Sequence, residues 1–180
     1  FIKYSQHGTF KYFTELMFYT IMEESREYMQ LRYLDANGNE TLRYDRTGIA
    51  RIPYKNDELQ NKANRYYFRE SLAIGEGNTW ISSLDLNMEY GKIQKPYVPV
   101  VRIATPLFES DLFQGVFVVN IFMEEMIKRL TSSPIYDIFL VDRNGNFISH
   151  KNPKYSWSKY NEKKYTLEDE FGRRASLLIL

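Results

Sequence analysis

The chain has 180 residues, of which 43% are hydrophobic and 26% are charged, and its 24 Lys and Arg against 23 Asp and Glu leave a net charge of +1. These values are typical of a globular chain of about one domain, or one domain and part of a second, and they argue against disordered and low-complexity proteins. The balanced charge argues against nucleic acid or an anionic membrane surface as a partner, and the absence of cysteine excludes disulfides, zinc–thiolate sites and thiol nucleophiles.

Residues 1–27 are predicted to form one helix, because apolar side chains such as Phe10, Phe13 and Met17 recur at spacings of three and four residues. At ~1.5 Å per residue this helix would be roughly 40 Å long, which is more than a small domain needs for its own core. Two interpretations remain open, a spacer that transmits movement and a long packing helix. The chain begins with Phe1 rather than Met and has no run of the ~20 apolar residues that a membrane span requires, so we expect a piece of a longer protein whose membrane anchor lies elsewhere.

From Tyr28 the apolar period changes to two, which predicts two strands joined by a tight turn at Asn37-Gly38. Asn-Gly between alternating runs is the strongest short-range hairpin signal, because both residues tolerate the positive φ that a tight turn needs. The rest of this part of the chain is predicted as a helix over 59–74, strands over 79–86, 98–108 and 113–122, and a helix over 123–130.

A later segment repeats the hairpin pattern, since Asp-x-Asn-Gly-Asn occurs at 35–39 and again 107 residues later at 142–146. The repeat predicts two copies of one unit that opens with a strand, a tight turn and a strand. The alternative is that the same favourable turn chemistry is used twice. The apolar residues 175–180 are predicted as a strand without continuation, so we expect the second unit to be small or to lack strands.

Few residues suit catalysis or metal binding. A hydrolase triad would need His7 or His150 as its base, because these are the chain's two histidines, and neither lies in a recognisable motif. The acidic run 168–170 is predicted to be solvated, so we expect no metal, and the chain has no cofactor motif. Glu70 and Asp85 are the acid–base candidates, which makes an enzyme the weakest alternative.

Aromatic residues make up 16% of the chain, and several surround Arg65 in Arg65-Tyr66-Tyr67-Phe68, which precedes Trp80-Ile81-Ser82. A guanidinium flanked by rings and hydroxyls suits a small carboxylate, because its fork binds two oxygens while the rings exclude water. The alternative is a surface arginine beside core aromatics. Arg102 and Asn120 are further polar residues in apolar strands, where each needs a partner, a solvated face or a place in a pocket wall.

These segments resemble the double Cache extracytoplasmic sensor domain of bacterial transmembrane receptors, which include sensor histidine kinases, diguanylate cyclases and chemoreceptors. The resemblance covers nearly the whole chain and depends on the serial order of four blocks, at 59–68, 80–93, 99–106 and 115–121. It implies an α+β, PAS-like fold with central antiparallel sheets. The implied organisation is a signalling helix at 1–27, a membrane-distal ligand-binding domain at 28–130 and a partial membrane-proximal domain at 131–180.

In the family that the chain resembles, the ligand lies between the helix with the Arg–aromatic motif and the sheet. Amino-acid-binding members carry Arg-x-Trp-Tyr-x-Asp on this helix and an Asp on the last strand. Here Arg65 keeps the carboxylate-binding position, while Tyr67 and Phe68 stand in place of Trp and Tyr. Glu70 replaces the helix Asp, and Asn120 replaces the strand Asp. The implied ligand-binding residues are Arg65, Tyr67, Phe68, Trp80, Ser82, Arg102 and Asn120.

Loss of the strand carboxylate disfavours an α-amino acid, because a buried ammonium prefers an ionised acceptor, so a small carboxylate or other anion is favoured and a neutral polar ligand stays open. The sequence therefore predicts a non-catalytic periplasmic input module for signal transduction that needs no cofactor. Ligand binding is expected to favour one of two packings of the N-terminal helix, within a homodimer formed through residues 1–27. The alternative is a protein–protein interaction module for a periplasmic partner, which an exposed aromatic patch would support.

Overall fold

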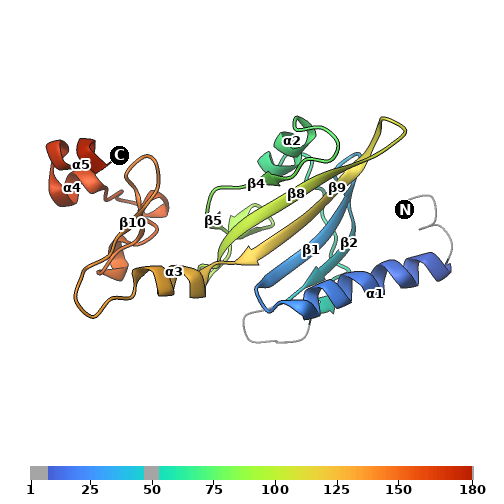
Figure 1. Ribbon diagram of the computed structural model, residues 1–180, viewed down its shortest axis with the longest axis horizontal. Coiled ribbons are helices and arrows are strands. Elements are labelled where there is room, and N and C mark those ends of the chain that lie inside the picture. The colour runs from blue at the N-terminus through green and yellow to red at the C-terminus, as the bar shows by residue number, and fades with distance from the viewer. Residues whose placement is uncertain (1–7, 47–52, 180) are drawn as a thin grey trace. The chain divides into compact units, whose positions relative to one another are not determined.

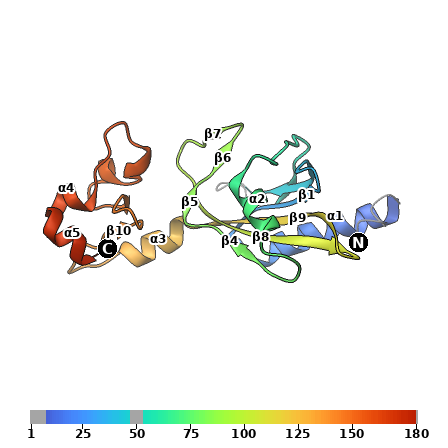
Figure 2. The ribbon, with the colours of Figure 1, turned by 90° about the horizontal axis from the view of Figure 1, so that it is seen from above.

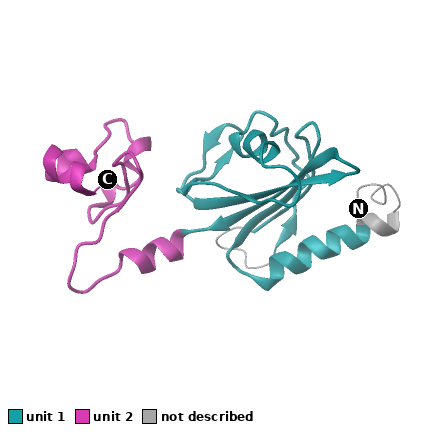
Figure 3. Ribbon diagram, turned by 45° about the horizontal axis from the view of Figure 1, so that its top comes forward, with its two compact units in different colours: residues 1–123 teal, residues 124–180 magenta. Residues whose placement is uncertain are grey.

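The computed structural model of the protein describes residues 8–46 and 53–179, with side chains described from residue 12 onward. The chain divides into two compact units, residues 1–123 (unit 1) and residues 124–180 (unit 2), which Figure 3 shows in different colours. The fold class is α+β with antiparallel sheets, as the sequence predicts. Residues 124–130 fall in unit 2, whereas the sequence-based boundary keeps them in the first domain.

Unit 1 is built on an antiparallel sheet with the strand order β3-β2-β1-β9-β8-β4, in which β5 also pairs with β8. Its elements in chain order are α1 (Gly8–Glu24), β1 (Tyr28–Asp35), β2 (Glu40–Asp45), β3 (Tyr54–Lys55), α2 (Tyr66–Leu72), β4 (Trp80–Ile81), β5 (Asp85–Leu86), β6 (Met88–Glu89), β7 (Lys92–Ile93), β8 (Pro99–Glu109) and β9 (Leu112–Phe122). Figures 1 and 2 show α1 on one face of the sheet and α2 on the other. The strands β6 and β7 pair with each other as a separate hairpin.

Helices cover both faces of β1, whose successive side chains point to opposite sides of the sheet. Leu31 faces α1 and is buried against Phe18 and Met22 of that helix. Leu34 faces α2 and is buried in a second apolar cluster that contains Tyr67. Because fully burying such a side chain stabilises the fold by ~1.5–3 kcal/mol, these two clusters fix the order of the layers.

The helix α2 is shorter than the sequence predicts, since it begins at Tyr66 rather than at residue 59. The backbone before it is held by the first hairpin instead of by helical hydrogen bonds. The Lys62 N–H donates to the Gly38 carbonyl oxygen over 2.7 Å, within the turn of that hairpin. Tertiary hydrogen bonds therefore override the helical periodicity of this segment.

The predicted hairpin at Asn37-Gly38 is confirmed as β1 and β2, and the two long predicted strands are confirmed as β8 and β9. The predicted strand 79–86 is interrupted and forms the short strands β4 and β5. The strand β3 and the β6–β7 hairpin were not predicted from the sequence. Of the predicted helix 1–27, α1 accounts for Gly8–Glu24, and residues 1–7 lie outside the described residues.

Unit 2 consists of short elements. They are α3 (Glu124–Thr131), β10 (Leu140–Val141), β11 (Phe147–Ser149), the 3-10 turns η2 (Pro153–Tyr155) and η3 (Ser158–Tyr160), α4 (Leu167–Phe171) and α5 (Arg173–Ile179). The predicted strand at 175–180 is wrong over residues 175–179, which belong to the helix α5, and residue 180 lies outside the described residues. A short apolar run fits a helix or a strand equally well, and the Arg, Ala and Leu residues here favour the helix.

The two copies of Asp-x-Asn-Gly-Asn form the same turn. In each copy the Asp carboxylate accepts the N–H groups of the residues two and four positions later, at 2.9 and 2.8 Å from Asp35 and at 2.8 and 3.0 Å from Asp142. In each copy the turn glycine carbonyl also accepts an N–H from a residue near the start of a helix, at 2.7 Å from Lys62, which precedes α2, and at 2.8 Å from Leu167, the first residue of α4. This equivalence extends beyond the turn and favours two copies of one unit over a shared turn motif.

Candidate ligand-binding site

The sheet face that carries α2 has a polar part beside its apolar cluster. A row of polar side chains in register crosses four strands, with Asp45 on β2, Gln30 on β1, Asn120 on β9 and Arg102 on β8. Each of these residues is at most 6% exposed. Because a buried polar group is unfavourable unless it is hydrogen-bonded, this row has to be satisfied within the protein or by a ligand.

Three arginines and two tyrosines lie together at this polar face, and we call Arg32, Arg65, Arg102, Tyr66 and Tyr67 the arginine–tyrosine cluster. The Cζ atom of Arg32 lies 5.3 Å from the centre of the Tyr67 ring. The Cζ atoms of Arg65 and Arg102 lie between 5.8 and 6.0 Å from the centres of both rings. Contacts of this kind between guanidinium groups and aromatic rings stabilise the cations but do not neutralise them.

Hydrogen bonds fix the head of Arg32 in this cluster. Its Nη1 donates to the Tyr67 hydroxyl over 3.1 Å, and its Nη2 donates to Asn120 Oδ1 over 2.8 Å. Burial opposes the charge of Arg32, but its attraction to Tyr67 and Glu40 outweighs that effect and raises its pKa above the ordinary value. Arg32 is therefore a permanent cation, although its buried Nε has no hydrogen-bond partner among the described residues.

The guanidinium charges of the cluster are incompletely neutralised. The Nη1 of Arg32 lies 3.5 Å from the Glu40 carboxylate, and the Nη1 of Arg102 lies 4.0 Å from that of Asp85. None of the ion pairs within 4.0 Å that the described residues form involves Arg65. A small anion between these groups would supply the missing negative charge and charge-assisted hydrogen bonds.

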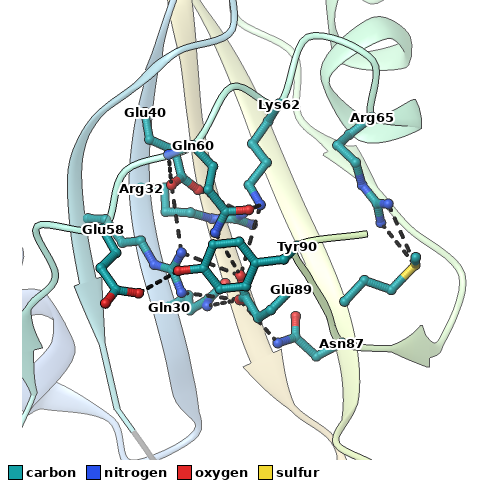
Figure 4. A network of polar contacts seen from close by, with 12 residues as sticks. Gln30, Arg32, Glu40, Glu58, Gln60, Lys62, Arg65, Asn87, Glu89 and Tyr90 are labelled. Atoms are coloured by element: carbon teal, nitrogen blue, oxygen red, sulfur yellow. Dashed lines mark hydrogen bonds and ion pairs between the residues drawn. The ribbon is translucent and has the colours of Figure 1, made fainter. Parts of the chain in front are cut away.

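A carboxylate of the β6–β7 hairpin enters the polar face beside the cluster, as Figure 4 shows. Glu89 accepts hydrogen bonds from the side-chain amides of Gln30 (2.7 Å) and Gln60 (3.1 Å). It also lies 3.1 Å from the guanidinium of Arg43 and 3.9 Å from the ammonium of Lys62. Burial opposes the ionised form, but Arg43 and the amide donors more than compensate and lower the pKa of Glu89 to about 2. We call these four donor residues the Glu89 cradle.

The structure brings four of the seven predicted site residues to the polar face. Arg65, Tyr67 and Arg102 belong to the arginine–tyrosine cluster, and Asn120 binds it through Arg32. Arg102 also donates from Nη1 to the Tyr66 hydroxyl over 3.0 Å.

The other three predicted residues have different surroundings. Phe68 is buried in the apolar cluster under α2. The Ser82 hydroxyl accepts the backbone N–H of Arg102 over 2.8 Å, where β4 ends. Trp80 packs edge-on against Tyr66 and donates its Nε1–H to Glu70 over 3.1 Å, so it borders the cluster from outside. The part of all seven residues in binding a ligand stays a prediction.

Arg32 and Glu40 lie on the first hairpin, where the sequence motif marks only the turn, and they were not predicted as site residues. Glu89 and its cradle residues Gln60 and Lys62 fall within the sequence blocks that carry the family resemblance, but no sequence signal gave them a part in the site. One signal was available, because Gln30 and Arg32 alternate with apolar residues along β1 and so share one face of that strand. Alternation of this kind is usual for a solvated face, and only the packing of α2 and the β6–β7 hairpin reveals that the face is buried.

The described parts of the chain contain no group of three or more His, Asp or Glu side chains that could hold a metal ion. No helix within the described residues is long and apolar enough to cross a membrane.

The model of the family described as bacterial histidine kinase, sensor domain, matches residues 3–171. The chain belongs to this family. The match confirms the resemblance to extracytoplasmic sensor domains of bacterial receptors that the order of its sequence blocks predicts. No curated protein matches the chain.

Solved structures share the fold of this sensor domain. A domain of a protein assigned to the sensory box/GGDEF family of Vibrio parahaemolyticus aligns with a TM-score of 0.84 and 21% identity, over 99% of this chain and 69% of its own. The extracellular domain assigned to the histidine kinase vpHK1S-Z8 gives 0.80 and 22%, over 91% and 60% of the two chains. The ligand-binding domain of the Campylobacter jejuni chemoreceptor Tlp3, in complex with 4-methylisoleucine, gives 0.54 and 15%, over 76% and 49%. The sensor domain thus spans between about half and 69% of the length of these structures.

Proposed function

We propose that unit 1 is the ligand-binding part of a periplasmic sensor module, and that a small organic anion such as a carboxylate binds at the arginine–tyrosine cluster. The observation that carries this proposal is the presence of three guanidinium groups around two tyrosine rings, with Glu40 and Asp85 as the carboxylates within 4.0 Å among the described residues. An anion that bridges the partly exposed Arg65 and the buried Arg102 would complete the charge balance.

The chemistry of Asn120 favours an anion without an ammonium group. Its amide is fully engaged, because Oδ1 accepts from Arg32 and Nδ2 donates to Gln30 Oε1 over 2.9 Å. An α-amino acid needs an ionised acceptor at such a position. The Tlp3 domain, which is similar in fold at 15% identity, is seen with two amino acids, L-valine and 4-methylisoleucine, which supports a small-molecule ligand here. The preference for an anion over an amino acid rests on Asn120 alone.

The same strands connect the proposed site to the N-terminal helix. Arg32 faces the cluster, while its neighbour Leu31 packs against α1 on the opposite face of the sheet. A ligand can favour one packing of α1 only if it binds the two packings with different affinity, so we propose that contacts with Arg32 supply this difference. Dimerisation through residues 1–27 stays a prediction, and α1 exposes the aromatic side chains of Tyr12 and Phe13 that such a contact could use.

A protein-interaction module is less well supported, because the aromatic rings around Arg65 do not form an exposed patch, although α1 exposes Tyr12 and Phe13. Tyr67 is 2% exposed, and Trp80 packs against Tyr66. The acid–base candidates of an enzyme also have other contacts, since Glu70 binds Trp80 and Asp85 lies near Arg102. The same proposal includes an output domain in the full-length receptor, either a histidine kinase or a diguanylate cyclase.

The test is a thermal-unfolding screen of the wild-type chain with acetate, propionate, succinate and L-alanine, followed by calorimetry with the best anion. A ligand at ~100 times its dissociation constant adds ~2.7 kcal/mol to stability. Arg65→Ala should weaken binding of that anion about tenfold or more, because a charge-assisted hydrogen bond contributes ~1.5–3 kcal/mol.

The matched control is Arg69→Ala, which removes an exposed arginine from the same helix. We expect it to bind the anion as the wild type does. Wild-type affinity in Arg65→Ala would remove Arg65 from the site, and a screen in which no anion stabilises the chain would contradict the proposed function.

A further inference from the structure

The β6–β7 hairpin is a small element that stands apart from the main sheet. Its two strands pair with each other, at Met88 with Ile93 and at Glu89 with Lys92. They are joined at Tyr90-Gly91, where both residues have positive φ (50° and 75°), as in the two-residue turns that match the twist of a hairpin. Within the described residues, neither strand pairs with a strand of the large sheet. The hairpin can therefore move away from the polar face without breaking the sheet.

Side chains attach this hairpin to the polar face. Glu89 binds across two strands, to Gln30 on β1 and to Arg43 on β2. The Tyr90 hydroxyl donates to Glu58 in the loop before α2, and Met88 Sδ lies 3.5 Å from both Nη atoms of Arg65. Figure 4 shows these contacts converging from the hairpin onto the strands and the loop.

Most of the polar contacts depend on one carboxylate. Gln30, Arg43 and Gln60 all donate to Glu89, and the ammonium of Lys62 lies close by. The pKa of Glu89 is lowered to about 2, so this group is ionised at neutral pH and the contacts are charge-assisted. With the hairpin in place, the underlying Arg43 is 4% exposed.

We propose that the β6–β7 hairpin is a lid over the polar face and that the Glu89 carboxylate is the latch that holds it closed. When the latch is released, the hairpin swings away from Gln30 and Arg43 and opens a path to the buried Arg32, beside the partly exposed Arg65. The inference adds a gate to the proposed anion site, and it rests on the proposed function only for the identity of what passes the gate.

The first test is hydrogen exchange, measured by mass spectrometry, of the amides of residues 88–93 in the wild type and in Glu89→Gln. The substitution keeps the shape of the side chain and removes its charge. We expect exchange in 88–93 to rise about tenfold or more, because so short a hairpin is only marginally stable once it is released from the polar face, while β1 and β9 keep their protection. Glu76→Gln makes the same chemical change at an exposed position and should leave exchange in 88–93 unchanged.

The second test measures access to the buried arginines with phenylglyoxal, which modifies guanidinium groups. Arg32 is 3% exposed beneath the polar contacts, and Arg46 is 4% exposed where it donates to the Met22 carbonyl, away from the hairpin. In Glu89→Gln we expect the modification of Arg32 to accelerate at least fivefold, on the order of the increase in hairpin exchange, while Arg46 reacts as in the wild type.

Gln60→Ala weakens the Glu89 cradle from the loop side, without a change in the hairpin, and serves if Glu89→Gln does not fold. We expect a smaller rise in exchange, confined to the same amides. Unchanged exchange in 88–93, or a rise shared equally by β1, β9 and Arg46, would overturn the latch and make Glu89 an ordinary part of the core. No ligand is used, so this outcome is independent of whether an anion binds.

Discussion

The Glu40 carboxylate partly neutralises two arginines at the polar face. Its side chain is fully buried, and its two oxygens lie 3.5 Å from Arg32 and 3.6 Å from Arg43. It also accepts the backbone N–H of Gln60 over 2.9 Å, which ties the loop before α2 to the first hairpin. One carboxylate thus serves two buried guanidinium groups and one backbone donor.

We predict that Glu40→Gln lowers the free energy of unfolding by about 3 kcal/mol, because removing one partner of a buried ion pair leaves an uncompensated charge in the interior. The measurement is urea unfolding followed by circular dichroism. Glu24→Gln, at an exposed position at the end of α1, should change stability by less than ~0.5 kcal/mol. A loss below about 1 kcal/mol in Glu40→Gln would mean that the unfavourable burial of Glu40 offsets its attraction to the arginines.

A place at the site could be predicted from the sequence for polar residues that interrupt an apolar or aromatic segment. Arg102 and Asn120 are polar in apolar strands, and Arg65 is surrounded by aromatic residues, and all three lie at the polar face. Arg32 and Glu89 could not be found in this way, because each lies in a segment where a polar residue is ordinary. Their importance comes from elements distant in the sequence that cover them.

Among the elements, the first hairpin positions the site more directly than the helix that carries the Arg–aromatic motif. The turn at Gly38 binds the loop that leads into α2, and this contact fixes where the helix begins. The spacing of apolar residues predicts a longer helix, because it contains no information about hydrogen bonds to a turn some twenty residues earlier. The strands β8 and β9 were predictable, because long alternating runs specify a strand locally.

Two glycines with nearly equal φ allow the contribution of the turn–loop contact to stability to be separated from backbone strain. Gly38 has φ +77°, and an added Cβ would lie 2.6 Å from backbone atoms of Ala63. Gly75 has φ +73° with nothing within 4 Å of an added Cβ. We predict that Gly75→Ala lowers stability by about 1–2 kcal/mol from backbone strain alone, and that Gly38→Ala loses about 1–3 kcal/mol more.

The measurement for this pair is thermal and urea unfolding of both variants beside the wild type. Equal losses in the two variants would show that the loop at Ala63 moves aside without resistance. In that case the turn would not fix the start of α2.

For the molecule as a whole, the two units share their opening hairpin but differ in charge chemistry. In unit 1 the polar residues gather under α2 and the β6–β7 hairpin, and they include the ionised Glu89. In unit 2 the carboxylate of Asp169 caps α4 together with Thr166, and these hydrogen bonds lower the pKa of Asp169 at an exposed position. Both units therefore lose favourable contacts in acid, but a buried cluster is expected to lose more than an exposed cap.

Glu89 should make the stability of the chain depend on pH in the acid range. Its folded pKa is about 2 against an ordinary value of 4.5, so the ionised carboxylate stabilises the fold above about pH 4.5, and this contribution disappears as the pH falls toward 2. With allowance for the partial exposure of the carboxylate, it amounts to about 2 kcal/mol at neutral pH. We predict that urea unfolding from about pH 7 to about pH 3 gives a steeper acid loss for the wild type than for Glu89→Gln. Asp169 is present in both proteins and contributes the same loss of stability in acid to each. If the free energies of unfolding of the wild type and Glu89→Gln fell in parallel over this pH range, Glu89 would have the same pKa in the folded and unfolded chain.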